Sequence, residues 1–250
     1  MRRLLVIGIG AGDPEHITVQ GIGALNRTDV FFVIEKGAED LVALRREITE
    51  RYVQPGRSYR VVEIADPRRD RAATHYRAAV DEWRERRADL WGSVLSSELA
   101  DGETGAFLVW GDPSLYDSTI AVVEEVIAKG TVEVEYEVVP GISSVHALTA
   151  RHRVPLNRVG GAVQITTGRR LAQGFPEGAD DVVVMLDAQC SFKRVLDQDL
   201  DIFWGAYLGT EDEILVSGHL SEVADEIQRR RREARKRKGW IMDTYLLRRR

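Results

Sequence analysis

Cysteine is almost absent from this chain: Cys190 is the single cysteine among 250 residues. One cysteine excludes an intrachain disulfide, and neither Cys190 nor the histidines have partners at the spacing of a metal site. Such sparse cysteine use is typical of a reducing compartment, so we expect a cytoplasmic protein without a bound metal.

Long apolar runs and a positive net charge are lacking as well. Apolar residues make up 44% of the chain, yet no run approaches the length of a membrane span. Residues 4–9 are too short for a secretion signal and lead into glycines and an acid. The net charge of -5 argues against nucleic acid as a partner. The basic run at 228–238 is therefore interpreted as the solvated face of a helix.

The first half of the chain alternates short apolar segments with helical stretches, which predicts an α/β fold with a parallel or mixed sheet. One amphipathic helix over residues 66–100, with a break near Trp91–Gly92, fits the longest connection. The expected strands of this half cover residues 4–9, 30–35, 59–64, 105–110 and 133–139.

Pro, Asn and a Gly pair interrupt the pattern at residues 154–162, which indicates a domain boundary. We expect one α/β domain over 1–157 and a second over 158–250. The second holds a basic helix at 221–238 and strands at 162–166, 181–186, 202–208, 213–218 and 240–247.

Two glycine-aspartate-proline turns follow predicted strands, in GIGAGDPEHIT and in WGDPSLYDS. The first is not a dinucleotide loop, because Asp13 stands where G-x-G-x-x-G needs its third glycine. Turns at the carboxyl ends of parallel strands share one edge of the sheet, where open α/β sheets bind ligands. We interpret the glycines as allowing close approach of backbone to a ligand. A capped turn without a ligand is the alternative for each loop.

A third loop, VVPGISSVHAL, opens a helix with Ser143 and Ser144. Serines at this position either cap the helix or face the same crevice as the other two loops. His146 lies in the helix, and a lone histidine is more often a surface or packing residue than a catalytic one.

These three motifs in this order, followed by VPL and by GTEDE at 209–213, resemble the tetrapyrrole methylases. The resemblance implies two α/β domains with an active-site trough between them, S-adenosylmethionine as methyl donor, a tetrapyrrole substrate and a homodimer. Four segments are similar to those of the family members that methylate precorrin-5 at carbon 1 and release acetate in cobalamin biosynthesis. These segments are 166–171, 183–188, 204–214 and 239–248.

The resemblance also implies the site residues. Glu35 is the expected base, because the aspartate that serves in some relatives aligns here with Ile34. Asp187, Tyr116, His146 and Arg169 are candidates for the deacetylation by motif position. The alternative is helix capping for Asp187 and lining of the cofactor wall for Tyr116. Arg169, Arg170 and His146 are the candidate substrate residues. Cofactor contacts are expected at Ala11 (usually proline in relatives), Trp110, Gly111, Asp112, Leu115, Ser143, Ser144, Met185 or Leu186, Leu208 and Gly209.

Four other functions stay open at this point. An NAD(P)-dependent oxidoreductase would explain the first glycine loop with Glu35 after the second strand, but not the second loop. A binding module without catalysis could use the same loops. Another methylase of the pathway, or diphthine synthase with its protein substrate, would share the fold.

Overall fold

The computed structural model describes the whole chain except residues 35–38, 66 and 68–75. It contains two compact units, one of Met1–Gly10 with Pro14–Ile142, the other of Ala11–Asp13 with Ser143–Arg250. This division falls one helix before the predicted boundary at residue 157. The reason is that helix α5 (Ser144–His152) packs on strands of the second sheet.

The sheet of the first unit is entirely parallel, as the alternating pattern predicts. Its strand order is β3-β2-β4-β1-β5, so β1 lies between β4 and β5. The strands are β1 (Arg2–Gly8), β2 (Val30–Ile34), β3 (Arg60–Ile64), β4 (Thr104–Val109) and β5 (Val134–Val139).

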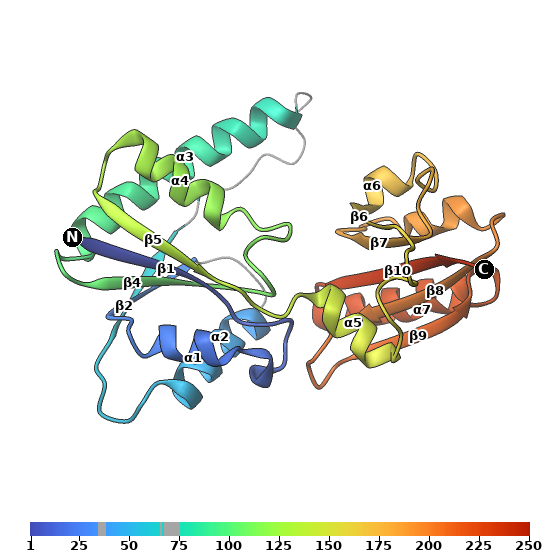
Figure 1. Cartoon of the computed structure of the whole chain (residues 1–250), viewed down its shortest axis with the longest axis horizontal. Coiled ribbons are helices and arrows are strands. Elements are labelled where there is room, and N and C mark those ends of the chain that lie inside the picture. Colours follow the sequence, from blue (N-terminus) through green and yellow to red (C-terminus); the bar gives the residue numbers. More distant parts are fainter. Residues whose placement is uncertain (35–38, 66, 68–75) are drawn as a thin grey trace. The chain divides into compact units, whose positions relative to one another are not determined.

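Helices cover both faces of this sheet, with α1 (Val19–Leu25) and α2 (Glu39–Tyr52) on one face (Figure 1). The opposite face is covered by α3 (Tyr76–Glu98) and α4 (Thr119–Lys129). A short 3-10 turn, η1 (Pro14–His16), precedes α1.

The predicted break in the long helix is wrong, because α3 runs unbroken through Trp91 and Gly92. Trp91 stacks on Phe107 of β4 with ring centroids 4.4 Å apart. A Cβ on Gly92 would lie 3.1 Å from the side chain of Thr131, so the glycine permits close packing. Residues 66 and 68–75 of the predicted helix lie outside the described residues.

The sheet of the second unit is mixed, with strand order β6-β7-β10-β8-β9. Strand β6 is parallel to β7, while β10 runs antiparallel to both β7 and β8. These strands are β6 (Val163–Thr167), β7 (Asp181–Met185), β8 (Leu200–Ala206), β9 (Ile214–His219) and β10 (Asp243–Arg249).

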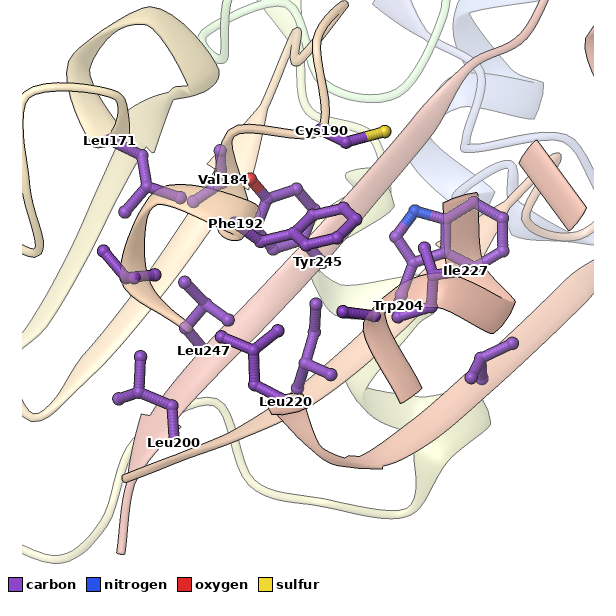
Figure 2. Close-up of a cluster of buried hydrophobic side chains, with 14 of the residues drawn as sticks. Leu171, Val184, Cys190, Phe192, Leu200, Trp204, Leu220, Ile227, Tyr245 and Leu247 are labelled. Carbon is purple, nitrogen blue, oxygen red and sulfur yellow. The ribbon is translucent and has the colours of Figure 1, made fainter. Parts of the chain in front are cut away.

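The core of the second unit lies between its sheet and helix α7 (Leu220–Lys238), with the 3-10 helix η2 (Ser191–Val195) beside it (Figure 2). Phe192 of η2 meets Tyr245 edge to face, with ring centroids 5.4 Å apart. Side chains alternate along a strand. Gly205 of β8 therefore faces away from this core, and a Cβ built on it would lie 2.8 Å from the side chain of Leu148 of α5.

The basic run forms the second half of α7, whose exposed residues form ion pairs at i, i+4 spacing, such as Arg229–Glu233 and Arg230–Glu226. This agrees with the predicted solvated face. Among the described helices, none is both long and apolar enough to cross a membrane.

Candidate active site

The two glycine-aspartate-proline turns lie side by side at the carboxyl edge of the first sheet. The amide of Gly111 donates to the carbonyl of Gly10 at 2.8 Å, and the amide of Gly10 donates to the carbonyl of Gly111 at 3.3 Å. The prediction that both turns share one edge is confirmed.

The third loop packs directly against the first two. A Cβ on Gly141 would lie 2.2 Å from the carbonyl oxygen of Gly111 and 2.8 Å from the Cα of Gly8. A Cβ on Gly8 would lie 2.6 Å from the amide nitrogen of Gly141. The sequence suggested that the glycines of the two glycine-aspartate-proline turns admit a ligand; at Gly8 the atoms nearest to an added Cβ belong instead to the backbone of Gly141 and Gly111.

Asp112 links the second loop to the third. Its Oδ2 accepts a hydrogen bond from the amide of Gly141 at 2.9 Å. Its Oδ1 accepts from the amide of Ser114 at 2.9 Å and from the Ser114 hydroxyl. The capped turn that the sequence left open is therefore present, whatever else the carboxylate binds.

Trp110 and Tyr116 stand on either side of this carboxylate in the sequence. Trp110 packs on the core beneath α1 and α2, and its buried Nε1–H has no hydrogen-bond partner among the described residues. Tyr116 is 45% exposed and adopts a φ of 53°. Partial burial raises the pKa of its phenol. A bulky side chain in the left-handed region is rare and often marks a functional site.

One edge of the second sheet gathers the remaining motif residues. Strands β6, β7 and β8 all end there, and β10 begins there, because Met185 pairs with Thr244 and Ala206 with Asp243. The predicted residues that follow these strand ends are Arg169, Arg170, Leu186, Leu208 and Gly209. Arg170 lines a hollow of about 460 Å³ together with Gln164 and Gln173.

Two bulky residues at this edge have left-handed backbones. Leu186 directly follows β7 with a φ of 55° and is 66% exposed, while Tyr207 follows β8 with a φ of 49°. The Tyr207 amide donates to the carbonyl of Met242 at 3.0 Å, and Met242 is itself 40% exposed. Tyr207 and Met242 were not named as site residues from the sequence, although both lie inside the matching segments 204–214 and 239–248.

Ala11 and Gly12 lie at this same edge of the second sheet. A Cβ on Gly12 would lie 2.3 Å from the carbonyl oxygen of Leu208, so residues 11–13, which belong to the second unit, pack against the turn after β8. Ala11 and Leu208 are both buried.

Asp187 is enclosed in a hydrogen-bond network and is 4% exposed. Its Oδ2 accepts from the Tyr245 hydroxyl at 2.7 Å and from the Ser191 amide at 2.5 Å. Its Oδ1 accepts from the Ser191 hydroxyl and the Gln189 amide, each at 3.0 Å. Burial, with the nearby Asp187 carboxylate, raises the pKa of Tyr245 well above its usual range. These bonds favour capping of η2 over the catalytic role predicted for Asp187.

Ser143 and His146 are brought together at the start of α5. The Ser143 hydroxyl caps the helix by accepting from the His146 amide and lies 2.9 Å from His146 Nδ1. This is the capping alternative for the serine. Glu35, the predicted base, lies outside the described residues. Within the described part of the chain, no group of three His, Cys, Asp or Glu residues could hold a metal ion.

Residues 3–224 match the family model of the tetrapyrrole (corrin/porphyrin) methylases. The chain is 54% identical, over 99% of its length and 95% of the relative's, to "Precorrin-6A synthase [deacetylating]" of a Sinorhizobium species. It is 25% identical, over 89% of its length and 90% of the relative's, to a probable cobalt-precorrin-2 C(20)-methyltransferase of Methanocaldococcus jannaschii.

Similar solved structures come from the same family. A putative cobalamin synthesis related protein (CobF) from Corynebacterium diphtheriae superposes with a TM-score of 0.85 at 37% identity, over 99% of this chain and 98% of the other. Uroporphyrin-III C-methyltransferase of Thermus thermophilus, solved with S-adenosylhomocysteine, shares the fold with a TM-score of 0.59 at 19% identity, over 98% and 96% of the two chains. The family match spans most of the chain, and two relatives well above 30% identity span nearly all of it; the chain belongs to the tetrapyrrole methylases.

Proposed function

We propose that this chain is an S-adenosylmethionine-dependent C-methyltransferase that methylates precorrin-5 at carbon 1 and releases the acetyl group as acetate, giving precorrin-6A. The observation that carries the proposal is the 54% identity to a deacetylating precorrin-6A synthase over nearly the full length of both chains. Other pathway methylases match at about half that identity or less, which makes them the second candidate.

The family's methyl donor is S-adenosylmethionine. We infer that Trp110, Gly111, Asp112 and Leu115 of the first unit contact it. The buried Nε1–H of Trp110, which has no partner in the described part of the chain, fits a ligand acceptor atom. The proposed contacts of the second unit are Ala11, Ser143, Ser144, Met185, Leu186, Leu208 and Gly209. The exposed Leu186 side chain fits the apolar face of the adenine ring, and backbone groups at Leu208 and Gly209 suit its polar edges.

S-adenosylmethionine supplies an electrophilic methyl group on a sulfonium. The protein must align that methyl with the ring carbon and exclude water, and positioning of this kind can supply much of the rate. Because transfer consumes the sulfonium charge, an apolar wall such as Met185 and Leu186 costs the transition state little. Arg169 and Arg170 would bind the acetate and propionate carboxylates of the tetrapyrrole.

Loss of the acetyl group requires water to attack its carbonyl carbon, which needs a base and a donor to the developing oxyanion. Tyr116, exposed on a left-handed backbone, is the proposed donor, and His146 is a further substrate contact. Asp187 is not proposed as a base, because four donors already occupy its carboxylate.

Glu35 remains the proposed base for the methylation step. Glu35→Gln should keep S-adenosylhomocysteine affinity within about twofold and lower kcat by about 100-fold or more. Calorimetric titration and turnover, measured on the same preparation, test this. Unchanged turnover would remove Glu35 from the proposal.

The class of enzyme is tested by titrating the protein with S-adenosylhomocysteine and, separately, with NAD. Saturable heat from the first alone supports a methyltransferase. Heat from NAD alone would favour the oxidoreductase. Methyl transfer to precorrin-5 without acetate release would favour another methylase of the pathway.

We also infer that the enzyme is a homodimer that works in the cytoplasm. The family resemblance supports the dimer, and the single cysteine supports a reducing compartment. Light scattering after size-exclusion chromatography would contradict the dimer if it returned the mass of one chain.

A further inference from the structure

Arg231 differs from the other basic residues of α7. It is 8% exposed, whereas Arg229 is exposed and Arg230 is half-buried, and both pair with glutamates of their own helix. Burying a guanidinium costs free energy unless its donors are satisfied. The hydrogen-bond partners of Arg231 therefore indicate which part of the structure it stabilises.

The Arg231 guanidinium joins a carboxylate to two backbone carbonyls. Its Nε donates to Asp243 Oδ2 at 2.9 Å, and one of its terminal nitrogens donates to the carbonyl of Asp187 at 2.8 Å. A weaker contact reaches the carbonyl of Ala188 at 3.4 Å. Trp204 Nε1 donates to the same Asp243 oxygen at 3.0 Å, which fixes the carboxylate.

These bonds hold a turn that follows Leu186 directly. The side chain of Asp187 is held from the other side by Tyr245 and Ser191. The turn is thus fixed through its main chain by Arg231 and through its side chain by the sheet and η2. Such double restraint is what a left-handed Leu186 needs, because this backbone persists only where its surroundings determine it.

Asp243 also lies at the edge where the other candidate residues gather. It pairs in register with Ala206, the last residue of β8, and follows Met242, whose carbonyl accepts from the Tyr207 amide. One ion pair therefore connects the turn after β7 with the strand next to the turn after β8.

We propose that the buried Arg231–Asp243 pair is a positioning device that holds the Leu186 turn in the conformation that binds the cofactor. The proposal rests on the proposed function, because it gives that turn a cofactor to bind. Buried ion pairs often add little net stability, so the expected effect is on binding geometry rather than on the folded state as a whole.

Arginine is required by this geometry. Its planar fork reaches a carboxylate and two carbonyls at once, whereas the ammonium of lysine is a compact donor on a flexible stem. Arg231→Lys keeps the charge and can still meet Asp243, but it cannot also bind the carbonyls of Asp187 and Ala188. The substitution therefore loosens the turn without removing the buried charge.

The experiment compares Arg231→Lys with Arg229→Lys, an exposed control in the same helix. We expect the Kd for S-adenosylhomocysteine and the KM for S-adenosylmethionine to rise about 10-fold in Arg231→Lys alone, with kcat changed less. Amide hydrogen exchange at Gln189 and Ser191 should also be faster in that variant than in the control.

Unchanged Kd, KM and exchange in Arg231→Lys would overturn the proposal. So would a lower Tm with an unchanged Kd, since that is the result of a purely structural pair. If Arg231→Lys does not fold, Asp243→Asn replaces it, because the amide keeps the shape of the carboxyl. Wild-type protein that fails to bind S-adenosylhomocysteine would contradict the proposed function itself, not this pair.

Discussion

Gly141→Ala tests whether the glycines at the carboxyl edge of the first sheet serve the packing of loop on loop. The added Cβ would lie 2.2 Å from the carbonyl oxygen of Gly111 and 2.7 Å from the carbonyl carbon of Gly8. Both contacts are with backbone, which cannot rotate away as a side chain can. The loops must separate by about 1 Å to restore van der Waals distance.

The cost has two parts. Overpacking of a close contact costs about 1–3 kcal/mol. Separating the loops also weakens the hydrogen bond from the Gly141 amide to the Asp112 carboxylate, and bonds to charged groups contribute about 1.5–3 kcal/mol. Because the loops can relax in part, neither cost is expected in full. We expect the free energy of unfolding to fall by about 3 kcal/mol, and therefore the Tm to fall by about 6–12 °C for a chain of this size.

Gly23→Ala is the matched control. Gly23 lies in α1, and beyond its chain neighbours and the backbone of its own helix no atom lies within 4 Å of a Cβ built there. Alanine in a helix is about 0.5–1 kcal/mol more favourable than glycine, so this variant should melt slightly higher than the wild type. Calorimetry gives both Tm values, and titration with S-adenosylhomocysteine should show weaker binding in Gly141→Ala alone. If Gly141→Ala melted and bound like the control, the loop-packing argument would be refuted.

Two further predictions concern the second unit. Asp187→Asn should lower the free energy of unfolding by about 2–3 kcal/mol, because it replaces one acceptor oxygen by an NH2 group that faces other donors. A variant that kept its Tm but lost all turnover would instead support Asp187 as a base. Burial lowers the pKa of His152, whose Nε2 bonds the carbonyl of Trp204, so its neutral form is favoured in the folded state. That contribution is complete above the unfolded pKa of about 6.5 and is lost as pH falls through the lower folded pKa. Urea midpoints should therefore fall more between about pH 7 and pH 5 in the wild type than in His152→Gln, and parallel profiles would contradict this.

Much of the fold follows from the sequence pattern. Every strand of both sheets overlaps a segment that the sequence predicts as a strand. Buried strands such as β1 and β7 are recognised by their apolar runs, whereas the mostly exposed β5 is recognised by alternation. The pairing of the Gly10 and Gly111 turns was also predictable, since parallel strands end at the same edge.

The particular contacts were not predictable in this way. Asp112 meets the amide of Gly141 only because β1 lies between β4 and β5, and strand order is a long-range property. The positive φ of Leu186 has no local signal, since leucine rarely adopts it.

The burial of Arg231 was predictable in part, although Arg231 lies within a run of basic residues that are mostly exposed. It continues the buried spacing of Leu220, Ala224, Ile227 and Ala234 on α7, at steps of three and four residues. Helical periodicity could therefore have separated it from its exposed neighbours, although not identified its partners.

In the proposed reaction this methyltransferase removes an acetyl group from the tetrapyrrole as it methylates it. The most direct test supplies precorrin-5 with methyl-labelled S-adenosylmethionine and measures label in the tetrapyrrole and free acetate in the same reaction. Acetate and incorporated methyl are expected in equal amounts, and both should depend on the cofactor. Labelled tetrapyrrole without acetate would contradict this expectation.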